Sequence, residues 1–76
     1  RVRALRERRY KYAYYFDPAG REPTEHEMYD LERDPDERRN LLELRTAEPF
    51  DPADRAARDE MSERLRLEMD RCATSA

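Results

Sequence analysis

The chain has 76 residues, of which 46% are charged and 37% are hydrophobic, and its net charge at pH 7 is −3. This length and composition allow one small domain with a thin core, and the acidic balance argues against a general polyanion binder. No apolar run approaches the roughly 18 residues of a membrane span, and the single cysteine excludes an intrachain disulfide.

Two strands are predicted at the N-terminal end. A short strand over residues 1–5 turns near Arg6-Glu7, and a stronger strand follows over residues 9–16. The second strand is indicated by period-two alternation with aromatic enrichment, which is typical of a half-buried strand. We expect Tyr15, which breaks the alternation, at a sheet edge or against another domain. The aromatic face consists of Tyr10, Tyr12, Tyr14 and Phe16.

A third strand is predicted over residues 27–32. It follows a type I turn over residues 17–20 and a polar hairpin loop over residues 21–26. Tyr29 and Leu31 fall on one face of this strand, and Met28 and Asp30 on the other. Because the connection is too short for a helical crossover, we expect strands 9–16 and 27–32 to pair antiparallel.

A short capped turn is predicted over residues 34–39. Asp34 can cap a single helical turn, Pro35 suits its first position, and Glu37 can reach back as in a capping box. Asn40 is then the expected left-handed terminator. Three leucines after it are expected to turn toward the core: Leu41, Leu42 and Leu44.

The last element is a helix over about residues 52–72, capped by Asp51 and opened by Pro52. Apolar residues recur on it every four positions, which indicates one apolar face. We therefore predict an α+β fold in one unit spanning 1–76: a small antiparallel sheet of two to four strands, with the helix on its aromatic face. The helix stripe consists of Ala53, Ala57, Met61, Leu65 and Met69, extended by Cys72.

Several short motifs follow one another along the chain: Val2-Arg3, Arg9-Tyr10-Lys11-Tyr12, Glu27-Met28-Tyr29-Asp30-Leu31, Asp34-Pro35, Glu37 and Asn40-Leu41. Their order resembles the C-terminal end of sulfatases, the sulfuric-ester hydrolases. Met28 stands where that family usually has leucine, and Ala4 where threonine is frequent. The resemblance covers nearly the whole chain. It implies a C-terminal subdomain of a larger enzyme, whose absent catalytic domain is the partner on which it packs.

The resemblance also implies where the chemistry would lie. Sulfatases use a formylglycine made from the first residue of Cys/Ser-x-Pro-x-Arg, together with a divalent metal, here expected to be calcium. Cys72, Ser62 and Ser75 do not begin such a pattern. We therefore expect no catalytic, cofactor-binding or metal-binding residue in this chain. The substrate of the parent stays open among aryl, choline and carbohydrate sulfates, and a related phosphonate hydrolase is an alternative.

Three features invite sharper interpretations that we do not favour. His26 lacks convergent partners beyond its glutamate neighbours, so a loop histidine is expected. Asp34, Asp36 and Asn40 lack the glycine and the twelfth-position glutamate of a calcium loop. Cys72 is expected to be a small residue at the end of the helix stripe rather than a reactive thiol.

An interaction module is the main alternative function. The segment Arg1–Lys11 holds six basic residues and one acid, and it could dock on acidic protein or nucleic acid. The acidic net charge and the matching helix stripe favour a sheet core over a base-stacking platform, so nucleic acid and membrane are not expected partners. A further possibility is homo-association through apolar surface left exposed without the catalytic domain.

Overall fold

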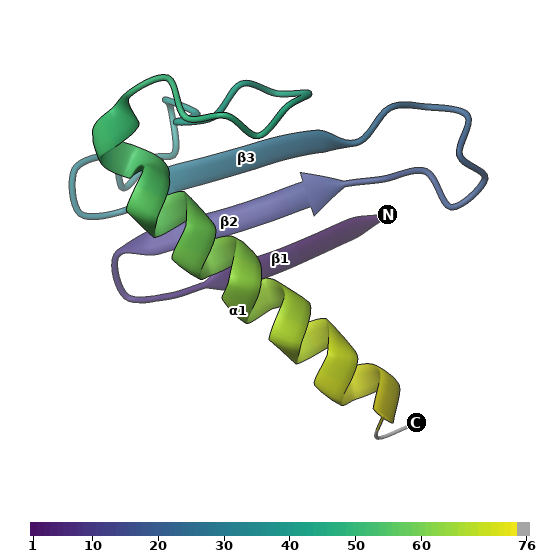
Figure 1. The fold of residues 1–76 in the computed structure, drawn as a ribbon. Helices are drawn as coiled ribbons and strands as arrows, with labels where there is room; N and C mark the ends of the chain where they lie inside the picture. The colour runs from purple at the N-terminus through teal and green to yellow at the C-terminus, as the bar shows by residue number, and fades with distance from the viewer. Residues whose placement is uncertain (75–76) are drawn as a thin grey trace.

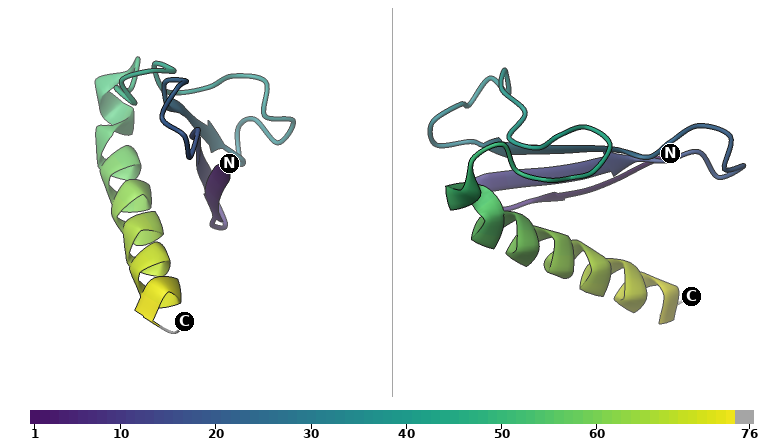
Figure 2. Two further views of the ribbon diagram at one scale, coloured as in Figure 1. Left: turned by 90° about the vertical axis from the view of Figure 1, so that its right-hand side faces the viewer. Right: turned by 45° about the horizontal axis from the view of Figure 1, so that its top comes forward.

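The computed structural model of the chain describes the backbone of residues 1–74 and the side chains as far as Arg71. Three antiparallel strands lie side by side in chain order: β1 (Val2–Arg6), β2 (Tyr10–Tyr15) and β3 (Glu25–Asp30). A 3-10 turn, η1 (Pro52–Asp54), leads into the helix α1 (Arg55–Thr74), which crosses one face of the sheet (Figures 1 and 2). The predicted α+β class is confirmed.

The register places the aromatic side of β2 under the helix. Tyr12 lies opposite Leu5 of β1 and Met28 of β3, so these three residues share one face. Tyr12 is 4% exposed and Met28 is fully buried. Tyr10 and Tyr14 flank Tyr12 at two-residue spacing and pack on the same core. The fourth aromatic position, Phe16, lies beyond β2 and contacts the ring of Tyr14 at a centroid distance of 5.8 Å.

The helix covers this core with most of its predicted stripe. Met61 and Leu65 are buried, and Ala57 and Met69 pack at their sides. Ala53 is exposed in η1, so its assignment to the stripe was wrong. The cause is the cap: the Asp51 carboxylate accepts from the Ala53 N–H at 2.9 Å, which starts the helix as a 3-10 turn. The side chain of Cys72 lies outside the described residues.

The third strand begins and ends two residues earlier than predicted. It pairs with β2 along its whole length, from Glu25 opposite Tyr15 to Asp30 opposite Tyr10. These ladder hydrogen bonds outweigh the polar composition that suggested a loop up to residue 26, so His26 belongs to the strand. Met28 and Asp30 lie on the helix side, whereas Leu31 lies in the following turn.

Residues 34–39 do not form the predicted helical turn. The Asp34 carboxylate does not cap a helix; it accepts from the N–H groups of Arg38 and Arg39, four and five residues on, at 3.0 and 2.9 Å. The chain closes a β-turn in which Glu37 N–H donates to the Asp34 carbonyl at 3.1 Å. Glu37, with φ 55°, is the left-handed residue in place of Asn40. No apolar side chain in this segment would hold a helix against the core.

Asn40 has a different role: it joins the following segment to the outer edge of β3. Its amide accepts from Met28 N–H at 3.1 Å and donates to the His26 carbonyl at 3.0 Å. Leu41 N–H donates to the Met28 carbonyl, and His26 N–H donates to the Leu44 carbonyl. Residues 40–44 thus act as a substitute fourth strand. Leu42 is buried as predicted, but Leu44 is 38% exposed, because its backbone carbonyl bonds to β3 while its side chain does not enter the core.

Candidate functional site

The two outer edges of the sheet differ in how their backbone groups are satisfied. At β3, the outward N–H and C=O groups of His26 and Met28 all have partners in residues 40–44. At β1, the hydrogen bonds lie on the inner side, toward β2. Arg1 and Phe16 exchange two of them, of 2.6 and 2.7 Å, and Glu7 N–H donates to the Tyr10 carbonyl at 2.8 Å. In an antiparallel pair, the backbone groups of successive residues point alternately toward the partner strand and away from it, so the odd-numbered residues of β1 bond to β2.

The backbone groups of Val2, Ala4 and Arg6 therefore point away from the sheet. No group in the described part of the chain bonds to them, and β1 is the end strand of the sheet. A row of unpaired N–H and C=O groups is a template for another strand. We call this row the β1 edge.

The arginines around the β1 edge lack acidic partners. Within the described residues, no carboxylate oxygen lies within 4 Å of the guanidinium groups of Arg1, Arg3, Arg6 or Arg8. Arg3 instead stacks over Phe16, with 5.6 Å between its central carbon and the ring centroid. We call these four residues the unpaired arginines.

The neighbouring basic residues of β2 behave differently. Arg9 contacts Asp30 at 3.1 Å, and Lys11 contacts Glu37 at 2.8 Å. Sequence reasoning identified the basic segment Arg1–Lys11 as a whole, but it could not divide it into paired and unpaired cations. That division depends on which cations lie close to acidic side chains in the folded chain: Arg9 and Lys11 of the second strand region do, and within the described residues the four arginines around β1 do not.

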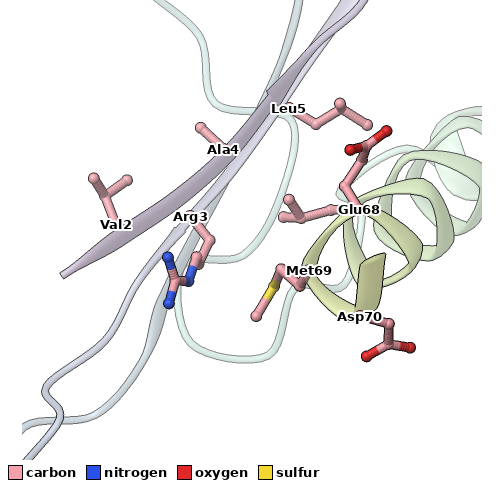
Figure 3. A pocket seen from close by; sticks show the side chains of 8 residues that line it. Val2, Arg3, Ala4, Leu5, Glu68, Met69 and Asp70 are labelled. Carbon is pink, nitrogen blue, oxygen red and sulfur yellow. The ribbon is translucent and has the colours of Figure 1, made fainter. Parts of the chain in front are cut away.

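A groove runs beside the β1 edge, between β1 and the C-terminal half of α1 (Figure 3). Its volume is about 790 Å³. Leu5, Leu65 and Met69 supply apolar surface, and Figure 3 shows Arg3 and Met69 on facing sides. Glu68 and Asp70 line the helix side, where they pair with Arg71 and Arg66, respectively. The groove thus combines apolar surface with charged side chains, and its two acids already have arginine partners.

The sheet face opposite α1 is covered by no helix or strand of residues 1–74 (Figure 2). Val2 is 51% exposed there and Tyr15 is 42% exposed. Tyr15 donates a hydrogen bond to a Glu27 oxygen at 3.0 Å, which raises the pKa of Tyr15. Burial raises the pKa of Tyr29 to about 12. We call this surface the open face; both phenols stay protonated on it at neutral pH.

His26 lies on the helix side of β3, with its ring 6.1 Å from that of Tyr14. Burial, assisted by the charge of Arg58, lowers the pKa of His26 below 6.5. Its Nδ1 has no hydrogen-bond partner in the described part of the chain. In that same part, no three His, Cys, Asp or Glu side chains gather into a possible metal site. His26 is therefore a strand residue facing the core rather than a loop residue, and it has no visible ligand set.

None of the helices in the described chain has the length and apolar character needed to cross a membrane. Among the other residues considered from the sequence, Ser62 borders a small pocket under α1, and Ser75 lies outside the described residues. A scan against protein-family models and searches of curated proteins and of solved structures found no match.

Proposed function

We propose that this chain is the C-terminal structural subdomain of a sulfatase-family enzyme, non-catalytic by itself and packed on the catalytic domain of its parent. In this proposal the parent hydrolyses sulfate esters through formylglycine and a bound divalent metal, expected to be calcium. Both belong to the catalytic domain. The contribution of this chain is a rigid surface that completes the fold of the parent.

The observation that carries the proposal is that the residues behind the sulfatase resemblance bond to one another. Arg9 of one motif pairs with Asp30 of another at 3.1 Å, and Lys11 pairs with Glu37 at 2.8 Å. Asn40 bonds to the Met28 backbone at 3.1 Å. Four of the motifs thus help to hold this small fold together, as expected of a structural subdomain whose pattern serves packing and not catalysis.

The open face supports a packing role. A sheet face with exposed Val2 and Tyr15 costs free energy in water when nothing covers it. The core on the other side is thin, and a domain of this size gains only about 3–5 kcal/mol from one core. A neighbouring domain laid on the open face would supply the missing stabilisation.

Two measurements test the proposal. The reading frame upstream of Arg1 is expected to encode a Cys/Ser-x-Pro-x-Arg pattern, and the longer protein is expected to hydrolyse an aryl sulfate in the presence of calcium. The 76-residue chain alone is expected to be inactive. Turnover by the purified 76-residue chain, or a frame that encodes no such pattern, would contradict the proposal. A phosphonate ester assayed in parallel separates the two hydrolase classes.

A second candidate is an interaction module that uses the basic segment Arg1–Lys11. The specific observation in its favour is the set of four unpaired arginines, which leaves positive charge without an internal partner. Fluorescence anisotropy with an acidic polymer, such as a labelled oligonucleotide, is expected to give salt-dependent binding at micromolar protein. Absence of binding at low salt would remove this candidate.

A further inference from the structure

The β1 edge, the unpaired arginines and the groove form one continuous surface. Val2, Ala4 and Arg6 offer outward backbone groups over the length of one short strand. By contrast, the opposite edge is closed by Asn40 and the segment after it. One edge of this sheet is therefore satisfied from within the chain, and the other is left for pairing.

The charges around the β1 edge select what can pair there. A second copy of β1 placed antiparallel about Ala4 would bring Arg3 of each copy beside Leu5 of the other and add three or more arginines from each side. Like charges on neighbouring strands are unfavourable. Along β1, Arg3 projects on the helix side with Leu5, and Arg6 projects on the opposite face. An incoming strand with acidic side chains on the face away from the helix would instead neutralise Arg6, while an apolar residue on its helix side would enter the groove over Leu65 and Met69.

We propose that the β1 edge is a strand-addition site that binds an extended, acidic peptide segment of a partner polypeptide. The segment adds a fourth strand beside β1, so its backbone supplies the hydrogen bonds and its carboxylates pair with the unpaired arginines. This inference rests on the second function proposed above and makes it specific. It separates recognition of an acidic strand from attraction of any polyanion.

The test uses the peptide acetyl-Glu-Val-Glu-Val-Glu-Val-Glu-amide, titrated into the 76-residue chain at low salt. Two further peptides carry N-methyl groups on alternate peptide nitrogens, one on the odd set and the other on the even set. Only one set faces β1 in a strand pair. We expect one methylated peptide to bind as the parent peptide does, and the other to lose at least tenfold in affinity. Equal binding of all three peptides would overturn strand addition and leave a purely electrostatic module.

Backbone hydrogen exchange supplies the second readout. The amides of Val2, Ala4 and Arg6 are expected to become protected when the peptide binds, whereas those of Arg3 and Leu5 are already protected by β2. The change Ala4→Pro removes one outward donor without touching the ladder to β2, and it should weaken the peptide at least fivefold. Protection elsewhere, or none, would contradict the proposal even if Ala4→Pro disturbed the fold.

Charge variants complete the experiment. Arg6→Gln is expected to weaken the acidic peptide about threefold and to reduce its salt dependence, whereas Arg3→Gln, on the helix side where the valines lie, should weaken it less. Arg39→Gln, an exposed arginine on the loop beyond β3, is the matched control and should have no effect. If the chain without peptide self-associates and protects the Ala4 amide as protein concentration rises, the occupant is a second copy and the proposal is wrong.

Discussion

At the scale of single residues, Asn40 substitutes for a stretch of backbone. Its side-chain amide accepts from Met28 N–H and from Leu42 N–H, both at 3.1 Å, and donates to the His26 carbonyl at 3.0 Å. A primary amide carries a donor and an acceptor in the same arrangement as a peptide group. It can therefore continue the hydrogen bonding of β3 where no strand is present.

Replacing Asn40 should destabilise the chain more than its partial exposure suggests. Asn40→Ala leaves the buried N–H of Met28 without its partner, so we expect a loss of about 2 kcal/mol in the free energy of unfolding. Urea denaturation followed by circular dichroism measures the loss. Arg39→Ala, one position earlier and exposed, is the control and should change stability little. A loss for Asn40→Ala no larger than for the control would show that the amide bonds are dispensable.

Asp30 should make the fold sensitive to acid. Its side chain is largely buried, which by itself would raise the pKa of the carboxyl. Hydrogen bonds from Arg9 and from the N–H groups of Arg33 and Glu32 outweigh this effect and leave the pKa below 3.8. A lowered pKa in the folded state means that Asp30 stabilises the fold fully above pH 3.8 and loses this contribution as the pH falls through the lowered value.

The variant Asp30→Asn should flatten this acid dependence. The asparagine side chain keeps one acceptor oxygen for the backbone but carries no charge, so the variant protein should be less stable than wild type at neutral pH. Below pH 3.8 the difference in stability between the two proteins should shrink, because the wild-type carboxyl is then losing its charge as well. Denaturation midpoints at pH 7, 5, 4, 3 and about 2 would measure the convergence. If the two proteins lost stability in parallel down to the lowest pH, Asp30 would not be responsible.

At the scale of elements, stability depends on the contact between α1 and the sheet. Met61→Ala removes a buried side chain that packs in the core with Tyr12 and Leu65, and we expect a cost of about 3 kcal/mol. That is most of what a core of this size supplies. Leu67→Ala, on the same helix but 52% exposed, should cost far less. Thermal unfolding of both variants tests the contrast, and equal losses would contradict the observed packing of α1.

Regular periodicity explains which elements could be predicted from the sequence. Tyr10, Tyr12 and Tyr14 recur every two residues, and Ala57, Met61 and Leu65 every four. Each pattern can be read from neighbouring residues and places its apolar side chains on a single face, which must pack against the core. The pairing of the second and third strands was predictable as well, because a short link permits only antiparallel neighbours.

The elements that could not be predicted depend on contacts distant in sequence. An aspartate before proline is favoured both at the start of a turn and at a helix N-cap, so Asp34 alone could not decide between them. In the structure its carboxylate accepts from the N–H groups of Arg38 and Arg39, which lie further along the chain than the partners of a helix cap. Asn40 looked like a helix terminator because its actual partners lie 12 and 14 residues earlier. The unpaired arginines differ from Arg9 only in having no acidic neighbour, which the register decides.

At the scale of the whole molecule, the two edges of the sheet differ. The β3 edge is hydrogen-bonded to residues 40–44, whereas at the β1 edge only the charge of the arginines opposes pairing with another copy of the chain. Removing that charge should let copies of the chain pair along the β1 edge. Arg3→Thr with Arg6→Thr keeps good strand formers while deleting two like charges, and we expect concentration-dependent self-association. Sedimentation velocity over a tenfold range of protein concentration measures it, with Arg39→Thr as the control. A double variant that stays monomeric throughout would show that charge does not guard the edge.

The exclusive use of arginine around β1 has a consequence for how any complex responds to acidity. Guanidinium groups keep their proton throughout the range in which proteins are stable, so this surface has the same sign at pH 5 as at pH 9. A ligand held there by carboxylates would be released in acid because the ligand loses its own charge. The pH at the midpoint of that release would report the pKa of the carboxyl groups of the ligand. It would thereby give a first chemical description of the ligand.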